Sequence, residues 1–491
     1  MIICKQFIWV LLFSSACACP LFAQSAPPAP PAIVDQAAAA GTPIPPEPFG
    51  PTWDSLKTNY TVPEWLRDAK FGIMIHWGIY SVPAHGSEWY EKHMYGNPAF
   101  IKWHTEHFGP LDKFGYKNFI PMFTCSNWDP NAWAALFKQA GAKYIVLTAI
   151  HHDGFALWDS KVNPWNAVRM GPHRDLVGDL AKSVRKRGLK FGVSNHDMEH
   201  FTFIQPTPGL KTDLYDSKWA GFYSVADRSP AACEKFLENW VGQNEELIDQ
   251  YRPDILWFDN AVNPRRLDPL KLKIAAYYYN RAAAWGKPVS LSTKDDAYLY
   301  GSFEDFERSS RMPKETFDYP WEVDQPVLYR FGYTENSPIA SADACVRLLV
   351  DATSKNGSLL LNISPRADGA IPDRQQNLLR QIGAWLHVNG QAIYASRPWK
   401  QFGEGSGRDS IRFTTRGNTL YAISFAWPTN ELDITELAKT RSTGEVNSVT
   451  LLGHRGHLEF TQDDTGLKIK PPAEKPCDYA YSFKISGLEL K

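Results

Sequence analysis

Residues 144–149 (YIVLTA), 175–188 (DLVGDLAKSVRKRG) and 191–194 (FGVS) have the pattern of a strand, a helix and a second strand. The two short segments are mostly apolar, as strands buried on both faces are. The middle segment places Leu176, Leu180 and Val184 on one helical face and ends at Gly188. Such a strand–helix–strand unit predicts a parallel sheet covered by helices.

The same alternation continues on both sides of this unit. Strands are expected at 71–76, 254–258, 289–292 and 359–362, and helices at 130–140 (capped by Asp129), 232–251, 270–284, 342–353 and 374–387. The sequence places six or seven of the eight strands that such a barrel contains, so the expectation includes an irregular barrel. We therefore predict an α/β fold in which residues 56–397 form a (β/α)8-like (TIM-type) barrel. No GxGxxG or GxxxxGK[ST] motif follows a strand, which weakens a nucleotide-binding interpretation.

The pattern changes after residue 397. Short β-type segments at 410–414, 419–425, 446–452, 458–461 and 479–485 are separated by Gly, Asn and Asp. This spacing is typical of a small antiparallel domain. We predict a C-terminal β-sandwich over residues 398–491.

The amino terminus reads as an export signal followed by a linker. Lys5 precedes an apolar stretch over 7–16, and a cleavage site is expected after Ala23, so residues 1–23 are predicted to be a signal peptide. Residues 24–55 are rich in Pro and Ala and are predicted to be an extended linker. A periplasmic or extracellular location follows, with lipid attachment at Cys17 or Cys19 as the less favoured alternative.

Composition and cysteine spacing narrow the function. Lys+Arg 52 against Asp+Glu 53 gives a net charge of −1, which argues against a nucleic-acid partner. No later apolar stretch reaches the ~18 residues of a membrane span. Cys125, Cys233, Cys345 and Cys477 are widely spaced without CxxC, so no zinc frame is predicted.

Ionisable residues follow the predicted strands where each strand ends. These residues are His76, His151, His152, Asp153, His196, Asp259, Lys294 and Asp295. A single one of them is more often a core histidine or a helix cap. Ionisable groups at the ends of successive strands predict a catalytic pocket at the carboxyl end of the barrel.

Three chemistries could use this pocket. Metal hydrolysis usually needs HxH or HExxH, and neither occurs; adjacent His151 and His152 would point to opposite sides of an extended strand. Chemistry with a serine nucleophile is not favoured, because the sequence has no G-x-S-x-G motif to position the serine. Paired-carboxylate sugar chemistry needs a nucleophile, for which Asp259 is suited, and a proton donor from the acidic segment 301–324.

Several motifs then match one family in unchanged order from about residue 63 to 399. They are 71–83 (FGIMIHWGIYSVP), 87–90 (SEWY), 151–158 (HHDGFALW), 171–180 (GPHRDLVGDL), 256–259 (LWFD), 356–362 (NGSLLLN) and 368–372 (DGAIP). In these motifs the chain resembles the α-L-fucosidases of glycoside hydrolase family 29. The resemblance implies a barrel with a C-terminal β-sandwich, a fucosylated oligosaccharide or glycoconjugate as substrate, and retaining double displacement without a metal or other cofactor.

The resemblance also implies roles for individual residues. Asp259 matches the nucleophile, and Phe331 matches an aromatic that packs on the sugar's apolar face. The residues that match binders of the sugar hydroxyls are His76, Glu88, Trp89, His151 and His152. At two positions the chain departs from the family pattern, and both residues are expected to belong to the sugar site. His196 stands near the position of the family's usual tyrosine. Lys294 stands in place of an arginine and supplies its charge, but not its bidentate hydrogen bonding.

The acid/base residue is less well defined. The segment 305–308 (DFER) matches the branch of the family that carries the glutamate directly, which favours Glu307. Alternation along an extended segment would turn Asp305 and Glu307 to one side and Glu304 to the other. Arg308 could pair with a carboxylate, which counts against an acid role. Glu304 and Glu322 therefore remain alternatives.

The sequence thus predicts an exported, exo-acting, retaining α-L-fucosidase. The first alternative is the same chemistry on α-L-galactosides. The second is a non-catalytic sugar-binding protein on the same scaffold, and the third is a metal-dependent barrel hydrolase. Linkage, aglycone, transglycosylation capacity and oligomeric state are left open.

Overall fold

The computed structural model describes residues 47–490. The predicted signal peptide, with Cys17 and Cys19, and most of the predicted linker lie outside these residues. Helix α1 (Trp53–Asn59) begins three residues inside the range expected to be linker. The Thr52 hydroxyl caps it by accepting from the Ser55 backbone N–H, and Leu56 is buried beneath it. Within residues 47–490, no helix has the length and apolar character needed to cross a membrane.

Eight parallel strands form a closed barrel, which confirms the predicted fold. The strands are β1 (Phe71–Ile75), β2 (Tyr144–Ile150), β3 (Lys190–Asn195), β4 (Ile255–Phe258), β5 (Ser290–Lys294), β6 (Ser302–Asp305), β7 (Trp321–Pro326) and β8 (Gly357–Ile363). Pairing of β1 with β8, in which Phe71 lies opposite Leu359, closes the circle. Strands β6 and β7 were not placed from the sequence.

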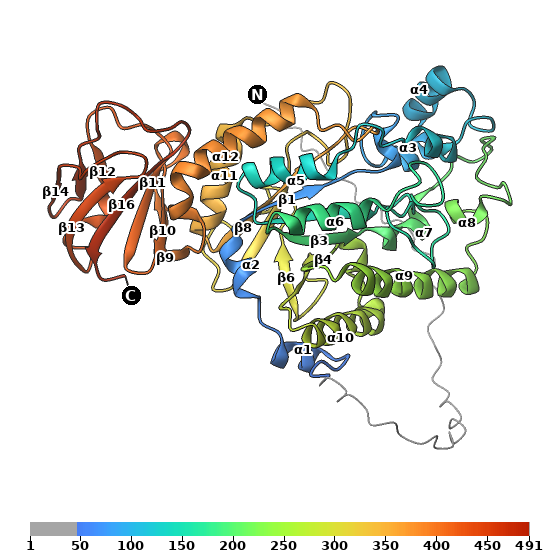
Figure 1. The fold of residues 1–491 in the computed structure, drawn as a ribbon, viewed down its shortest axis with the longest axis horizontal. Helices are drawn as coiled ribbons and strands as arrows, with labels where there is room; N and C mark the ends of the chain where they lie inside the picture. Colours follow the sequence, from blue (N-terminus) through green and yellow to red (C-terminus); the bar gives the residue numbers. More distant parts are fainter. Residues whose placement is uncertain (1–46, 491) are drawn as a thin grey trace, which may run out of the picture.

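Helices surround most of the barrel (Figure 1). The principal ones are α5 (Pro130–Gln139), α6 (Leu176–Lys186), α9 (Pro230–Tyr251), α10 (Asp268–Ala284), α11 (Ala342–Ser354) and α12 (Asp373–Ile393). Asp129 and Asp175 accept from backbone N–H groups as N-caps of α5 and α6. In the described part of the chain no helix separates β5 from β6 or β6 from β7, so the barrel is irregular on that side.

The barrel interior is filled at its amino-terminal end. An apolar cluster there includes Met74, Ile255, Trp257 and Phe303, and α2 (Glu64–Ala69) contributes Leu66 to it. Gly72 is required at this level, because a Cβ on it would lie 2.3 Å from the ring of Tyr144. This plug leaves the carboxyl end of the strands as the end that can hold a site.

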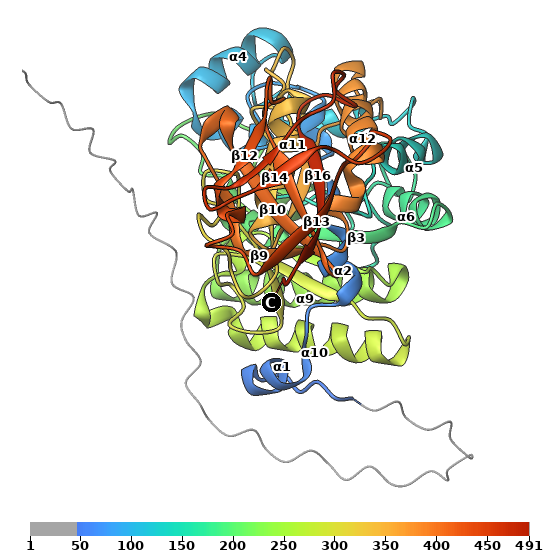
Figure 2. The ribbon, with the colours of Figure 1, turned by 90° about the vertical axis from the view of Figure 1, so that its left-hand side faces the viewer.

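Residues after the barrel form two antiparallel sheets, as predicted. The larger has the order β13 (Gly444–Leu451), β16 (Tyr481–Leu488), β11 (Thr419–Ser424), β10 (Ile411–Arg416), β9 (Arg397–Glu404). The smaller has the order β12 (Leu432–Ile434), β15 (Leu467–Ile469), β14 (Phe460–Gln462). Both contribute to one apolar core, so they pack as a sandwich, which Figure 2 views in front of the barrel.

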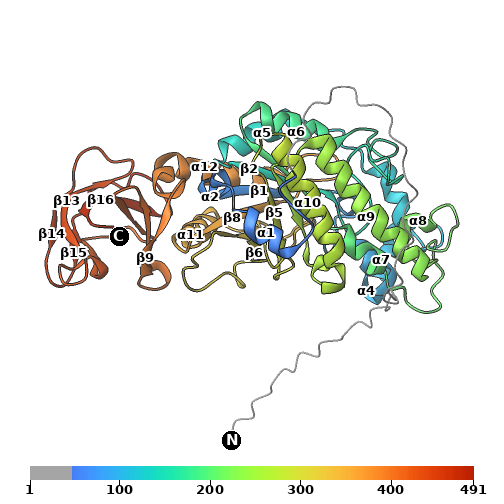
Figure 3. The same ribbon diagram turned by 90° about the horizontal axis from the view of Figure 1, so that it is seen from below.

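The sandwich packs against α11 and α12. The Trp385 indole N–H donates to the Ala480 carbonyl at 2.8 Å, and the Arg347 guanidinium donates to the Phe425 carbonyl at 2.9 Å. The segments with α3 (Tyr90–Gly96), α4 (Pro98–Phe108), α7 (His200–Phe203) and α8 (Ala220–Tyr223) lie at the opposite end of the molecule (Figures 1 and 3). These segments follow β1 and β3, so the carboxyl ends of the strands face away from the sandwich.

Candidate active site

A cavity of about 1790 Å³ lies at the carboxyl ends of the barrel strands. Polar side chains reach it from just after β1, β2, β3 and β4 and from the end of β5. The predicted site residues that line it are His76, Glu88, Trp89, His151, His152, His196, Asp259, Lys294, Glu307 and Phe331. Glu304 and Glu322, the two alternatives for the acid, do not line it.

Asp259 lies at the centre of this group. Its Oδ1 is 3.1 Å from the Lys294 ammonium, and its Oδ2 is 3.3 Å from His196 Nδ1 and 3.5 Å from His152 Nε2. Burial raises the pKa of Asp259, but the Lys294 charge and the hydrogen bonds from the two histidines outweigh it and hold the pKa well below its ordinary value. The carboxyl group is therefore ionised, as a nucleophile must be.

His76 is held as a neutral ring of defined tautomer. Asn362 Oδ1 accepts from the His76 backbone N–H at 3.1 Å and lies 2.7 Å from His76 Nδ1. Because Asn362 Nδ2 donates to the Phe331 carbonyl at 2.8 Å, the amide orientation is set and His76 Nδ1 must be the donor. Burial holds the pKa of His76 well below its usual value, so Nε2 is left as an acceptor.

His151 and His152 both line the cavity, because the alternation of sides expected for an extended strand does not extend to them. Strand β2 ends at Ile150, and beyond it the two rings lie 4.3 Å apart between centroids. His151 Nδ1 is buried and finds no hydrogen-bond partner within residues 47–490, and burial holds the pKa of His151 well below its usual value. This ring can hydrogen-bond a ligand hydroxyl.

The pKa of His152 is shifted in the opposite direction from that of His151. His152 Nδ1 lies 2.8 Å from the His196 carbonyl, and so it donates. Burial lowers the pKa of His152, but the hydrogen bond to Asp259 and the charge of Glu199 raise it above its usual value overall. His152 is therefore more easily protonated than a free imidazole, and its Nε2 lies beside the Asp259 carboxylate.

His196 also lines the cavity. Its Nε2 lies 2.9 Å from Ser194 Oγ, and its ring stacks on Trp257 with centroids 5.1 Å apart. Burial lowers the pKa of His196, so the ring is neutral and polar on an otherwise apolar floor.

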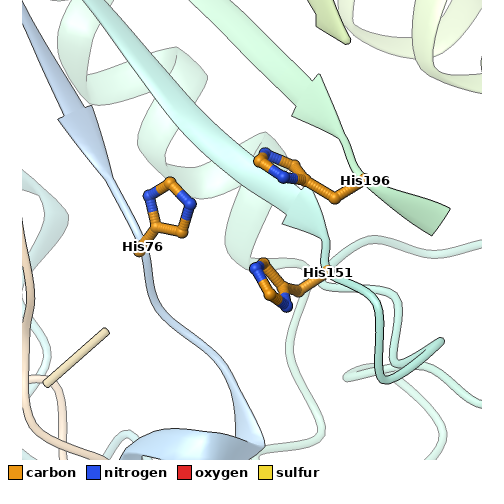
Figure 4. A group of neighbouring side chains, drawn as sticks. All are labelled: His76, His151 and His196. Carbon is orange, nitrogen blue, oxygen red and sulfur yellow. The ribbon is translucent and has the colours of Figure 1, made fainter. Parts of the chain in front are cut away.

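Three of these histidines also have the composition of a metal site. One nitrogen each of His76, His151 and His196 lies within 4.8 Å of the others, and Figure 4 shows the three rings around a common space. Imidazole nitrogens suit Zn²⁺, and a motif search misses this set because its members come from three strands. Both nitrogens of His196 already have partners, Ser194 and Asp259, so a metal ligand there would have to break one of these hydrogen bonds.

Lys294 joins the acids of the site. Its ammonium is 3.1 Å from Asp259 Oδ1, 3.3 Å from Glu307 Oε2 and 3.4 Å from Asp324 Oδ2. Burial lowers the pKa of Lys294, but these carboxyl groups together raise it well above its ordinary value. Lys294 is therefore a permanent cation at the end of β5.

The three candidates for the acid have different surroundings. Glu307 faces the cavity, with Oε1 3.8 Å from Arg308 Nε. Glu304 accepts from the Tyr319 hydroxyl at 2.8 Å, outside the cavity. Glu322 is fully buried inside the barrel, where it accepts from the Tyr144 hydroxyl at 2.9 Å and contacts Ser292 Oγ.

Two distant segments form the wall beside His76. Glu88 Oε2 accepts from the Gly332 backbone N–H at 2.9 Å, and a Cβ on Gly332 would lie 2.9 Å from Glu88 Cβ. The Phe331 ring lies 5.0 Å from that of His76, and the Trp89 ring meets His152 edge-on. Carboxylate, imidazole and aromatic groups thus lie together, as a sugar pocket requires.

Some site residues were not predicted. Glu199 lies 3.6 Å from His152 Nε2, Asp324 contacts Lys294, and Asn362 orients His76. Asn362 belongs to the NGSLLLN motif and ends a predicted strand, so a signal for it was present. Asp324 lies in β7, which was not predicted.

Family models match most of the chain. The α-L-fucosidase model matches residues 36–391, and the α-L-fucosidase C-terminal domain model matches residues 405–486. Tissue α-L-fucosidase of Mus musculus is 33% identical over 90% of this chain and 96% of its own length. Tissue α-L-fucosidase of Homo sapiens is also 33% identical, over 91% of this chain and 93% of its own length.

A solved structure shares the fold over nearly its whole length. The crystal structure of Thermotoga maritima α-fucosidase is 34% identical with a TM-score of 0.73, covering 88% of this chain and 99% of that one. The resemblance found in the sequence motifs is thereby confirmed. This chain, with its closed barrel and C-terminal sandwich, belongs to the α-L-fucosidase family and is an α-L-fucosidase, a glycoside hydrolase.

Proposed function

We propose that this α-L-fucosidase is exo-acting and retaining, with Asp259 as nucleophile and Glu307 as acid/base. The distance between the two carboxyl groups carries the proposal. Asp259 Oδ1 and Glu307 Oε2 lie 3.1 and 3.3 Å from the same nitrogen, so they can be no further apart than the sum of these distances, 6.4 Å. Retaining enzymes place their carboxyl groups about 5–5.5 Å apart, whereas inverting enzymes leave about 6.5–9.5 Å for a water molecule.

The reaction begins with Asp259 ionised and Glu307 protonated. Asp259 attacks C1 of the fucosyl group, and Glu307 gives its proton to the departing glycosidic oxygen. A fucosyl ester of Asp259 and a Glu307 carboxylate result. Glu307 then takes a proton from water, which attacks C1, restores Asp259 and releases fucose with its original configuration.

Lys294 is the counter-ion for both halves of this cycle. Before the attack the negative charge is on Asp259, and afterwards it is on Glu307; both contact the same ammonium group. The charge moves from one side of Lys294 to the other, so a buried cation is never left without a partner. A buried unpaired charge would be costly, and a fixed cation avoids reorganisation during the reaction.

The rest of the pocket accounts for the sugar. His76, His151 and Glu88 supply acceptors and donors for hydroxyl groups, and Phe331 supplies an apolar wall for the C6 methyl group. The plug around Trp257 closes the barrel beneath the site, which limits entry to a terminal sugar. A Thermotoga maritima α-fucosidase 32% identical to this chain is described in complex with fucose, which supports fucose as the ligand here.

We also propose that the protein is exported from the cytoplasm. Export is supported by the sequence of residues 1–23, which lie outside the described residues. The substrate is then a fucosylated glycan or glycoconjugate outside the cytoplasm. The mature amino terminus, measured by mass spectrometry of protein secreted from an expressing cell, is expected to begin after Ala23.

One assay tests substrate and stereochemistry together. An aryl α-L-fucoside and the matching α-L-galactoside are incubated with the enzyme, and the first anomer released is identified by proton NMR. We expect hydrolysis of the fucoside with α-fucose as first product. First release of β-fucose would refute retention, and preference for the galactoside would move the substrate assignment to that sugar. Loss of activity in chelator, restored by Zn²⁺, would favour the metal-dependent alternative at the three histidines.

A further inference from the structure

Lys294 contacts a third carboxyl group, Asp324, which the proposed reaction does not use. Asp324 Oδ2 lies 3.4 Å from the Lys294 ammonium nitrogen, beside the contacts of that nitrogen with Asp259 at 3.1 Å and with Glu307 at 3.3 Å. The side chain of Asp324 is 1% exposed and that of Lys294 is 5% exposed. Because a buried charge is costly without a partner, the two side chains depend on each other.

Strand β7 turns Asp324 toward Lys294. Side chains alternate along a strand, so Trp321 and Val323 pack in the large apolar core while Glu322 and Asp324 turn to the other side. Asp324 is two residues nearer the carboxyl end of β7 than Glu322, and it lines the cavity, whereas Glu322 does not. Within residues 47–490, Glu322 forms no ion pair with Lys294, so it is a natural control on the same strand.

The backbone of β7 also positions the segment that carries Glu307. The Phe306 N–H donates to the Glu322 carbonyl at 2.9 Å, and the Arg308 N–H donates to the Asp324 carbonyl at 2.9 Å. Glu307 lies between these two anchored residues. Asp324 therefore holds the backbone next to the proposed acid and, through its carboxyl group, contacts the cation that Glu307 also contacts.

A lysine at the end of β5 needs such a third contact. Its ammonium is a compact charge on a flexible stem, without the planar fork that orients an arginine. Two of its three N–H donors are directed to Asp259 and Glu307. Asp259 follows β4, Glu307 follows β6 and Asp324 belongs to β7, so the three carboxyl groups restrain the ammonium from three parts of the barrel wall.

The other charged groups around this pair determine where its negative charge lies. Burial raises the pKa of Asp305 well above its ordinary value, so Asp305 is neutral. Burial also raises the pKa of Asp324, but the Lys294 charge opposes that rise. The negative charge is therefore on Asp324, the acid that contacts the cation. The titratable and charged groups that face Lys294, Asp324 or Glu307 are His76, His196, Asp259, Asp305, Arg308 and Glu322.

We propose that Asp324 is a positioning residue, whose carboxylate holds the Lys294 ammonium in contact with both Asp259 and Glu307. This inference rests on the proposed function, because it takes Lys294 as the counter-ion that these two residues share. Without Asp324 the ammonium can move toward one of the two carboxyl groups and away from the other. A preorganised electrostatic contact is then lost at one stage of the reaction.

Asp324→Asn tests the proposal, because it removes the charge and keeps the size of the side chain. We expect kcat to fall about tenfold, less than for removal of a preorganised charged group itself, with KM nearly unchanged because Asp324 acts through Lys294. The alkaline limb of the pH–rate profile should move to lower pH, since loss of a nearby negative charge makes the site release its proton more readily. Should Asp324→Asn not fold, as judged by its Tm, Asp324→Ser replaces it.

Two further variants make the test specific. Glu322→Gln, on the same strand, should retain kcat. In the double variant Lys294→Met/Asp324→Asn, kcat should be no lower than in Lys294→Met alone, because the target of Asp324 is already absent.

Multiplication of the two losses in the double variant would overturn the proposal, as would an unshifted pH–rate profile in Asp324→Asn. Both of these outcomes leave the proposed function intact. A loss in Asp324→Asn confined to substrates with poor leaving groups, and rescued by azide, would make Asp324 the acid itself. That result would overturn the positioning role and also refute the proposed role of Glu307.

Discussion

The two sides of the barrel mouth differ in charge. The side formed by β1, β2 and β3 presents His76, His151 and His196, whose pKa values are lowered by burial, so these rings are neutral. His152 is the exception on this side, because Asp259 and Glu199 raise its pKa. The side formed by β5, β6 and β7 presents or encloses ionisable groups: Lys294, Asp305, Glu307, Glu322 and Asp324. Asp259, at the end of β4, lies at the boundary between them.

The histidine side is suited to binding the sugar, and the side with Lys294 and the acids is suited to stabilising the charge that moves during bond cleavage. Neutral imidazoles can hydrogen-bond sugar hydroxyls without the desolvation cost of a buried ion. Bond cleavage moves a full negative charge, and that requires a cation and acids in fixed positions. The acidic side has a consequence for stability too, because Asp305, Glu322 and Asp324 are buried together, and burial raises the pKa of each.

The largest effect is expected at the boundary, with Asp259→Ala. Loss of the nucleophile should reduce turnover by about 10⁴–10⁶-fold without unfolding the protein. Azide should enter the vacated space and yield β-fucosyl azide, identified by NMR. Near-normal turnover by a folded Asp259→Ala protein would contradict the assignment.

Glu307→Ala tests the acid on the charged side. Substrates with poor leaving groups should slow by about 10²–10⁴-fold, and activated aryl fucosides far less, because only the former need protonation. Azide should give α-fucosyl azide, with configuration retained. Glu304→Ala and Glu322→Gln are the matched controls; if either shows this pattern and Glu307→Ala does not, the acid is elsewhere.

Lys294→Met removes the shared counter-ion. A loss of about 10²–10³-fold in kcat is expected, the size found for removal of one preorganised electrostatic group. The alkaline limb of the pH–rate profile should move to higher pH, because two carboxyl groups without a cation between them hold a shared proton more tightly. Lys294→Arg should restore most of the rate, since it keeps the charge. An unchanged profile in Lys294→Met would show that the cation is not part of the charge balance.

Glu322→Gln should affect stability and change activity least. Burial raises the pKa of Glu322 from 4.5 to about 7, so the folded protein keeps a proton that the unfolded chain releases between these values. Folding stability is therefore lost as the pH rises from about 4.5 to about 7. Because Glu322→Gln removes the ionisable group, it should raise the free energy of unfolding at neutral pH by on the order of 3 kcal/mol relative to the unsubstituted protein.

The measurement is urea unfolding of both proteins at pH 5 and pH 7.5. The lowered pKa values of His76 and His151 act in the opposite direction, costing stability below about pH 6.5, but they are common to both proteins and cancel in the difference. A difference in unfolding free energy that is the same at both pH values would show that Glu322 is ionised in the folded state.

The same two sides explain which strands could be predicted. β1 (FGIMI), β2 (YIVLTAI) and β8 (GSLLLNI) are almost continuously apolar, and helix caps such as Asp129 and Asp175 are local signals, so these elements are visible in the sequence. Asp305 of β6 (SFED) and Glu322 of β7 (WEVDQP) lie inside the barrel, where Trp257 Nε1 donates to Asp305 and Tyr144 donates to Glu322. The pattern of these two strands resembles that of a polar loop, because the groups that satisfy these acids belong to other strands.

The sequence by itself determined the family, the barrel with its sandwich, and the positions at which strands end in ionisable residues. Only the tertiary structure decided which of the three candidate acids faces the cavity, that His151 and His152 both line it, and that Lys294 contacts Asp259, Glu307 and Asp324 together. The physical reason is the range of the interactions. Periodicity and caps depend on residues a few positions apart, whereas the tautomer of a ring or the charge of an acid depends on groups brought beside it by closure of the barrel.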